Sequence, residues 1–205
     1  MTRFARRCGV DAVAVMGALL VVGTVPPVRA QAPGLPPIPL PDRPQLFETA
    51  EHSQIRLVVM TRGLSHPWGL AFLPDGSMLV TERQGRLRLI RNGMLDPTPI
   101  AGVPVVHARG LAGLMDVALH PRFRENQQVY LTYSKPVGDE VRVALARGRL
   151  DGLVLTDVRD LFLSDPVGGG GTAASRVVFG IDGTLFMTVG GAFGASGGGQ
   201  RAQDP

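Results

Sequence analysis

Few residues of this chain have side chains that act readily as bases, nucleophiles or metal ligands. The 205 residues include four histidines and one cysteine. Histidine changes charge near neutral pH, so it is the first candidate for a general base. His66 and His120 each precede a proline, and we expect packing, capping or turn roles for both. His107, just before the Arg109-Gly110 loop, is the one histidine retained as a candidate base.

The carboxylates do not form an obvious metal site. Glu82 and Arg83 end a predicted strand, where we expect an ion pair that is solvated or that joins neighbouring sheets. Asp116 stands at the head of another strand; it either caps a turn or faces a ligand, and we favour the structural role. A metal-dependent hydrolase needs several carboxylates around one ion. We assemble no such set from the candidates, which are Glu51, Glu82, Asp116 and Glu125, and the residues alone predict no metal ligand.

Two glycine runs, 168–171 and 197–199, invite comparison with a phosphate-binding loop. Neither run is followed by the Lys-Ser/Thr pair of a P-loop, and neither has a strand-to-helix context. Because glycine lets backbone approach a ligand closely, these runs are instead typical of loops around a flat ligand.

The elements that must position these residues repeat along the chain. Three segments have the pattern of a hairpin, in which an alternating apolar run, a turn and a second apolar run follow one another. They read GLAFLPDGSMLVTER, DVALHPRFRENQQVYLTYS and SRVVFGIDGTLFMTVG. Aligned on Phe72, Leu119 and Phe179, they recur about 47 and 60 residues apart, near the roughly 40 to 50 residues of a propeller blade. We predict an all-β fold, a β-propeller of four-stranded antiparallel blades.

The length accommodates about three such blades, whereas a closed propeller has at least four blades of about 40 residues or more each. The chain also ends at Pro205 within a polar, glycine-rich stretch. We therefore expect a truncated propeller that lacks its C-terminal blades. Such a propeller exposes strand edges, which favours aggregation.

Turn signals divide the repeats into strands. Pro74-Asp75-Gly76, Asn92-Gly93 and Asp182-Gly183 each predict a tight turn. The strands predicted for the first blade are 55–59, 70–73, 78–81 and 86–89; those for the second are 115–119, 129–133, 141–146 and 154–158; those for the third are 176–179 and 185–189. No window has sustained helical periodicity, so helices should be short or absent.

The N-terminal segment has the features of a secretory signal peptide. Three arginines precede an apolar core at 13–22, and Val28-Arg29-Ala30 fits a signal-peptidase site. The apolar run is about half of the roughly 20 residues that span a bilayer, which weakens the alternative of a membrane anchor. Arg6-Arg7 leaves a twin-arginine signal open. We predict a signal peptide at 1–30, a proline-rich tether at 31–52, a partial propeller at 53–205, a periplasmic or secreted location, and no membrane span after cleavage.

Cleavage changes the charge balance. The chain has 21 basic and 17 acidic residues; four arginines and Asp11 leave with the signal, so 17 and 16 remain. A nearly neutral mature protein without a basic run predicts no nucleic-acid partner. The only cysteine, Cys8, also leaves, which excludes a disulfide or a catalytic thiol.

Several runs together resemble one family. HPWGLAFLPDGSMLVTERQGRLRLI, GLAGLMDVALHPRF, NQQVYLTYS and SRVVFGIDGTLFMTVGG are similar to the soluble aldose sugar dehydrogenases that depend on pyrroloquinoline quinone (PQQ), also described as the glucose/sorbosone dehydrogenase family. The resemblance implies a six-bladed propeller with PQQ in the central channel and calcium nearby. It implies oxidation of an aldose at C1 to the lactone, a small-molecule sugar as substrate, and an external electron acceptor.

The resemblance also implies site positions. The family's base histidine lies four residues before the arginine of a Gly/Ser-Arg pair; the matching pair is Ser175-Arg176, so the base position is Thr172. The neighbouring acidic position becomes Gly171, and a substrate-side glutamine becomes Leu111. Arg176 is the candidate cofactor contact, while most other cofactor ligands would fall beyond Pro205. A threonine is no base near neutral pH, which leaves His107, beside a loop resembling a channel-facing loop, as a substitute.

Alternatives to an active dehydrogenase stay open. With threonine at the base position, the chain also fits a catalytically silent propeller that binds sugar, quinone or a protein partner. A propeller hydrolase such as a lactonase is a third reading, although its carboxylate set is not found. Fold class alone does not separate these functions.

Overall fold

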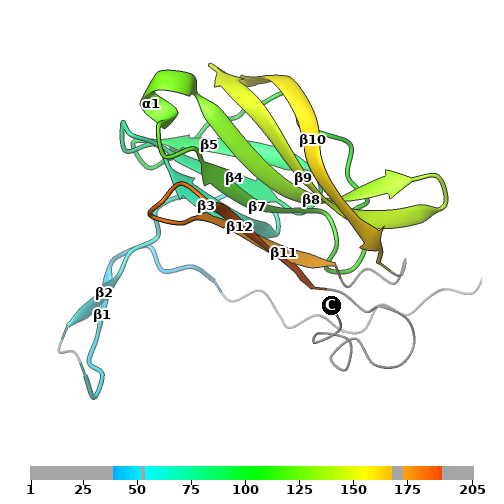
Figure 1. Ribbon diagram of the computed structural model, residues 1–205. Helices are drawn as coiled ribbons and strands as arrows, with labels where there is room; N and C mark the ends of the chain where they lie inside the picture. Colours follow the sequence, from blue (N-terminus) through cyan, green and yellow to red (C-terminus); the bar gives the residue numbers. More distant parts are fainter. Residues whose placement is uncertain (1–38, 52–53, 168–172, 191–205) are drawn as a thin grey trace, which may run out of the picture. The chain divides into compact units, whose positions relative to one another are not determined.

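The computed structural model describes residues 39–51, 54–167 and 173–190 (Figure 1). Within these ranges the chain is almost entirely β-strand, arranged in antiparallel sheets. The helix there, α1 (Phe123–Asn126), is a single turn. The all-β prediction and the expectation of short helices are thus confirmed. No helix in the described part is long and apolar enough to cross a membrane.

The first four-stranded sheet is a meander of neighbouring strands. It contains β3 (Pro67–Phe72), β4 (Met78–Glu82), β5 (Arg86–Arg91) and β6 (Met94–Leu95). At the β3–β4 turn, Asp75 Oδ1 accepts a hydrogen bond from Ser77 N at 2.9 Å, and Gly76 has φ of +85°. Asn92 and Gly93 both have positive φ, as a tight two-residue hairpin turn requires.

The second four-stranded sheet repeats the meander with longer outer strands. It contains β7 (Leu114–Leu119), β8 (Gln128–Val137), β9 (Glu140–Asp151) and β10 (Val154–Pro166). The sequence predicted only 154–158 of β10. The rest of β10 is an exposed edge strand with breaks in its register, so it lacks the apolar alternation that would have indicated it.

A two-stranded sheet, β11 (Ala174–Phe179) and β12 (Leu185–Gly190), begins a third blade. Its turn repeats the chemistry of the first: Thr184 N donates to Asp182 Oδ1 at 2.9 Å, and Gly183 has φ of +83°. The hairpin predicted at 176–189 is confirmed.

One strand assignment was wrong. The sequence placed 55–59 in the first blade, but β2 (Ile55–Leu57) pairs with β1 (Gln45–Phe47) in a separate hairpin. The fourth strand of the first blade is instead β6, which has two residues and therefore no detectable periodicity. β1 lies within the range that we expected to be an extended tether.

The three hairpins pack side by side through their first strands. β3 contacts β7, and β7 contacts β11 (Figure 1). Buried residues of the first two sheets form the main core between them, including Leu79, Leu87, Leu114, Leu131 and Tyr133. Tyr130 and Leu145 pack on the other side of the second sheet against Val177. Sheets stacked face to face around their innermost strands are the blades of a propeller, as predicted.

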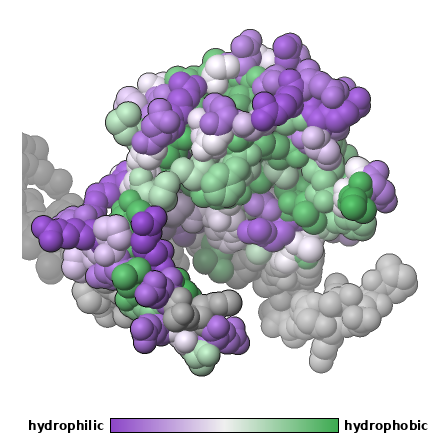
Figure 2. Space-filling model, turned by 90° about the vertical axis from the view of Figure 1, so that its left-hand side faces the viewer, coloured by the Kyte–Doolittle hydropathy of each residue, from purple (hydrophilic) through white to green (hydrophobic). Residues whose placement is uncertain are grey.

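The stack of three sheets has two end faces, which are the outer face of the first sheet and the outer face of the third. Both are more exposed than the faces packed between sheets. In the shared register, Leu70, Val117 and Val177 are equivalent, as are Leu79, Tyr130 and Phe186. Leu70 is 50% exposed and Phe186 is 57% exposed, whereas their equivalents are buried. Figure 2 shows hydrophobic residues reaching the surface below a hydrophilic rim.

Candidate functional site

Three equivalent residues lie on the innermost strands: Gly69 on β3, Asp116 on β7 and Arg176 on β11. We call them the inner-strand row. Each backbone N–H in the row donates to a threonine hydroxyl on the next strand of its own sheet, at distances of 2.8, 3.0 and 3.1 Å for Thr81, Thr132 and Thr188 respectively. In the first two sheets the strand register shifts at this point, so the hydroxyl replaces a missing ladder partner.

Asp116 joins all three inner strands. Its Oδ2 accepts a hydrogen bond from Val177 N at 2.8 Å and lies 3.4 Å from Arg176 Nε. Its Oδ1 lies against Gly69, where an added Cβ would be only 2.8 Å away. The carboxylate therefore fills space that only glycine leaves open, which supports the structural role that we favoured.

Arg176 differs from Asp116 in exposure. The Arg176 side chain is 73% exposed, while that of Asp116 is 5% exposed. Within the described residues, Arg176 has no side-chain partner except Asp116. Neither terminal nitrogen is bonded to another described residue, so both can donate to an oxygen ligand.

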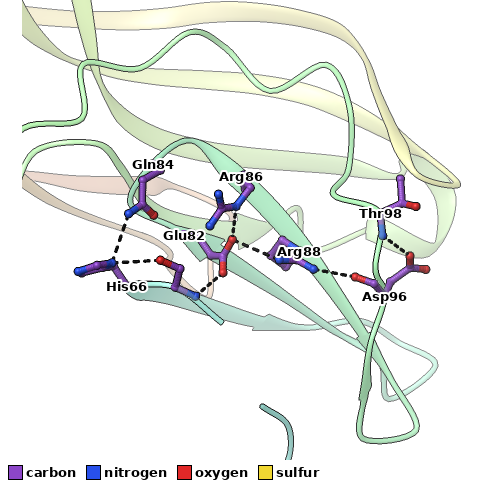
Figure 3. A network of polar contacts seen from close by, with 8 residues as sticks. His66, Glu82, Gln84, Arg86, Arg88, Asp96 and Thr98 are labelled. Atoms are coloured by element: carbon purple, nitrogen blue, oxygen red, sulfur yellow. Dashed lines mark hydrogen bonds and ion pairs between the residues drawn. The ribbon is translucent and has the colours of Figure 1, made fainter. Parts of the chain in front are cut away.

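A second charged network lies beside the start of β3 (Figure 3). Glu82 is fully buried and accepts hydrogen bonds from Arg86 Nε at 2.5 Å and Ser65 N at 2.5 Å, with Arg88 Nη1 at 3.4 Å. Burial alone would raise the pKa of Glu82, but the hydrogen bonds from Arg86 and Ser65 and the charge of Arg86 outweigh it, so the pKa is lowered. The group is a stable carboxylate rather than a proton donor.

This network corrects the expected Glu82–Arg83 pair. Glu82 pairs with Arg86 and Arg88 of its own sheet, and it is buried rather than solvated. Arg83 Nη1 instead donates to Gly110 O, which ties the first sheet to the loop before β7. Strand β4 ends at Glu82 and Arg83 begins the following turn, so the two neighbours in sequence have different partners.

His66 and His120 have local roles. His66 Nδ1 lies 3.2 Å from Ser65 Oγ and 3.3 Å from Gln84 Nε2 (Figure 3). His120 Nδ1 accepts a hydrogen bond from Arg122 N at 3.0 Å. The same nitrogen lies 2.9 Å from Asn126 Nδ2, so His120 is held within the turn before β8, in agreement with the expected turn role.

His107 is anchored through its backbone. Its N–H donates to Ser134 O at 2.8 Å, and its carbonyl accepts from Ser134 Oγ at 3.0 Å. The ring Nε2 is buried and has no hydrogen-bond partner among the described residues. A base needs access to the proton that it removes. The buried ring nitrogen of His107 therefore does not support the prediction that His107 serves as base in place of Thr172.

The other predicted site positions are Leu111, Gly171 and Thr172, and the structure brings together residues next to them in the sequence. Leu111 is 58% exposed, and Thr172 and Gly171 lie outside the described residues. The residues that follow Leu111 and Thr172, Ala112 and Ala173, are buried in one apolar cluster with Met115. Trp68 packs against the same cluster, so the loop before β7 and the segment before β11 meet beside the start of β3.

The two cofactors that the resemblance implies are calcium and PQQ, and the described side chains offer groups that suit PQQ. In the described ranges, no three or more His, Cys, Asp or Glu residues come together in a group that could hold a metal ion. The free terminal nitrogens of Arg176 match the carboxylate and carbonyl oxygens of a quinone such as PQQ.

Comparison with known proteins decides the family. The sequence model described as Glucose / Sorbosone dehydrogenase matches residues 64–205. The chain belongs to this family. The resemblance seen in the sequence motifs is therefore confirmed.

Family members of known sequence extend well beyond the matched region. The aldose sugar dehydrogenase YliI of Escherichia coli is 40% identical over 147 residues, which cover 69% of this chain and 39% of that protein. An uncharacterized protein of Synechocystis is 43% identical over 150 residues, covering 69% of this chain and 36% of its own length. The chain thus spans less than half the length of these relatives.

Solved structures of the family share the fold. The soluble aldose sugar dehydrogenase of Escherichia coli in its apo form is 39% identical, with a TM-score of 0.59, over 65% of this chain and 40% of that one. The PQQ-bound aldose sugar dehydrogenase of Streptomyces coelicolor is 28% identical, with a TM-score of 0.55, over the same shares. One family member is therefore known with PQQ bound.

Sequence reasoning missed the threonines of the inner-strand row. Thr81, Thr132 and Thr188 occupy the same place in the second strand of each hairpin, within VTE, LTY and MTV. That recurrence was visible in the aligned repeats. Its meaning was not, because a threonine in a strand is ordinary until its hydroxyl is seen to bond the neighbouring backbone.

Proposed function

We propose that the chain belongs to a quinoprotein sugar dehydrogenase that oxidises an aldose at C1 to the lactone, with PQQ as hydride acceptor. The observation that carries this proposal is Arg176 at the start of β11, exposed and joined to the inner strand of the second blade. The family match over 64–205 supports it. Because the chain spans less than half of its relatives, the activity of the whole protein is part of the proposal.

The residues of this chain would serve binding and orientation. Arg176 would donate hydrogen bonds from its terminal nitrogens to cofactor oxygens, and Asp116 would neutralise its charge on the other side. Leu111, exposed on the loop before β7, would contact the substrate with its apolar side chain. PQQ, when bound, supplies the hydride acceptor for the oxidation. The sugar hydroxyl proton would have to leave through a base, and Thr172 is not one near neutral pH.

The threonine favours a second candidate, a catalytically silent propeller that binds sugar, quinone or a protein partner. A positioned general base contributes typically about 10² to 10⁴ in rate. Loss of that contribution would leave binding intact while turnover falls. Calcium belongs to the proposal through the family resemblance, since no group of His, Cys, Asp or Glu side chains in the described ranges points to a metal ion.

Reconstitution with PQQ and Ca²⁺, followed by dye reduction with a panel of aldoses, separates the two candidates. An active dehydrogenase reduces the dye only when both quinone and aldose are present. If the protein binds PQQ without turnover, and Thr172→His gains activity while Thr172→Ser does not, the silent propeller is favoured. Failure to bind PQQ at all would refute both readings that depend on the cofactor.

The sequence features of residues 1–30 add a location to the proposal. A secretory signal there would send the mature protein to the periplasm or the exterior. Electrons would then pass to an external acceptor. Fractionation of cells expressing the whole chain, with N-terminal sequencing of the mature protein, tests cleavage after Ala30.

A further inference from the structure

The buried carboxylate of Asp116 accepts the N–H of Val177 and fills the space beside Gly69, but these contacts leave its negative charge without a counter-charge. Gly69 and Arg176 occupy the same position in the first and third blades, so the repeat does not require an acid there. A buried carboxylate is costly unless it is paired and hydrogen-bonded. A buried carboxylate in this place should therefore have a cation as partner.

Arg176 is that partner. Among the described residues it is the one cation within ion-pair distance of Asp116, with Nε 3.4 Å from Oδ2. The same Oδ2 accepts the N–H of Val177 at 2.8 Å, so the carboxylate is fixed to the backbone directly after Arg176. The backbone of Asp116 is also held, because its N–H donates to Thr132 Oγ1. On its other side, the carboxylate packs against Gly69.

The contact uses only one side of the guanidinium. Nε faces Asp116, and neither terminal nitrogen has a partner in the described ranges. An exposed arginine ordinarily samples many rotamers, and immobilising it costs conformational entropy. Fixing Nε removes part of this cost before a ligand arrives.

We propose that Asp116 is a positioning residue that holds Arg176 through Nε and leaves Nη1 and Nη2 directed to the oxygens of an anionic ligand at the inner strands. This deepens the proposed function, and it depends on that function only for the identity of the ligand. The chemical class is a planar compound with carboxylate or adjacent carbonyl oxygens, which suits the fork of a guanidinium.

The hold on Arg176 is tested by NMR without any cofactor. The Nε–Hε signal of Arg176 is assigned by its loss in Arg176→Lys. In the unmodified protein this proton should exchange with water at least about 10-fold more slowly than that of Arg109, because the Asp116 carboxylate 3.4 Å from Nε stabilises the charged guanidinium and repels the hydroxide that catalyses exchange. Asp116→Asn should abolish the protection. Glu140→Gln, which removes the partner of Arg142 elsewhere on the sheet, should leave it unchanged.

An Arg176 proton as labile as that of Arg109 overturns the proposal, even if Asp116→Asn does not fold. Unchanged protection in a folded Asp116→Asn variant overturns it too.

The ligand half is tested by titrating PQQ while following the fluorescence of Trp68, the single tryptophan. Asp116→Asn and Arg176→Lys should each weaken binding about 10-fold. The double variant should bind no more weakly than Arg176→Lys, because both changes remove one interaction. Equal affinity in Asp116→Asn and unmodified protein contradicts the positioning role. If unmodified protein binds no PQQ, the proposed function and this ligand both fail, while the exchange measurement still decides whether Asp116 holds Arg176.

Discussion

Tyr133 is a buried side chain whose pKa depends on that burial and on a neighbouring carboxylate. It is almost fully buried in the main core, and its hydroxyl donates to Asp160 Oδ1 at 2.6 Å. Asp160 also pairs with Lys135. Burial, followed by the hydrogen bond to Asp160 and its negative charge, raises the pKa of Tyr133 well above its ordinary value.

The raised pKa predicts a loss of stability in alkali. The unfolded tyrosine ionises near pH 10, while the folded one stays protonated, so unfolding releases a proton above that pH and is favoured as pH rises. Tyr133→Phe should cost about 1.5 to 3 kcal/mol at pH 7, as for a hydrogen bond to a charged group. Between pH 9 and 11 that difference should shrink, which urea unfolding at each pH measures. A constant difference across this range would contradict the raised pKa.

At the scale of elements, a threonine hydroxyl on the second strand of each sheet accepts a backbone N–H from the first strand, which in the first two sheets is the point where the register shifts. Thr132 is fully buried, whereas the equivalent Thr188 is exposed. Both accept a backbone N–H from the inner-strand row. The same bond therefore has a different energetic weight in the two blades, because water can replace only the exposed one.

Thr132→Val tests this weight. The substitution keeps the shape but leaves the N–H of Asp116 buried and unpaired, so the free energy of unfolding should fall by about 1 to 3 kcal/mol. Thr132→Ser, which keeps the hydroxyl, should lose less, about 0.8 kcal/mol for one methyl group. Thr188→Val should change little. Denaturant unfolding of the three variants provides the comparison, and equal losses at both threonines would argue against it.

At the scale of the whole molecule, one repeat position on the second strand of each hairpin is buried in the first two blades and exposed in the third. Leu79 is fully buried against the second sheet, and Tyr130 is buried against the third. Phe186 is the equivalent on β12 and is more than half exposed. An exposed apolar sheet face of this kind is a site of self-association.

Leu79→Ala and Phe186→Ala form a matched pair. The first should lower the free energy of unfolding by about 2 to 5 kcal/mol, because it leaves a cavity in the core. The second should change it by no more than about 0.5 kcal/mol, as for a surface position, and should reduce light scattering by associated protein. Denaturation midpoints and scattering measure the two effects. A loss at Phe186 as large as at Leu79 would show that this face is covered in solution.

Local chemistry made most of the fold predictable. Alternating apolar runs and the turns at Asp75-Gly76 and Asp182-Gly183 determine hairpins, since the aspartate and the glycine each satisfy a specific turn requirement within a few residues. The spacing of the hairpins then indicated blades. Strands without this local signal were missed, because β6 is too short and the far part of β10 is exposed. The strand at 55–57 was predicted, but its pairing with β1 was not, because pairing partners are not encoded in the local pattern.

The site could not be read in the same way. Four motifs in the expected order identified the family, and the one around Ser175-Arg176 singled out Arg176, because residue order alone carries such a match. The sequence by itself therefore determined the hairpins, their repetition and the family. Only the tertiary structure decided that Glu82 pairs with Arg86 and Arg88 rather than Arg83, and that Asp116 reaches Arg176 on the next blade, because contacts between strands depend on which side chains the packed sheets bring together and not on their distance along the chain.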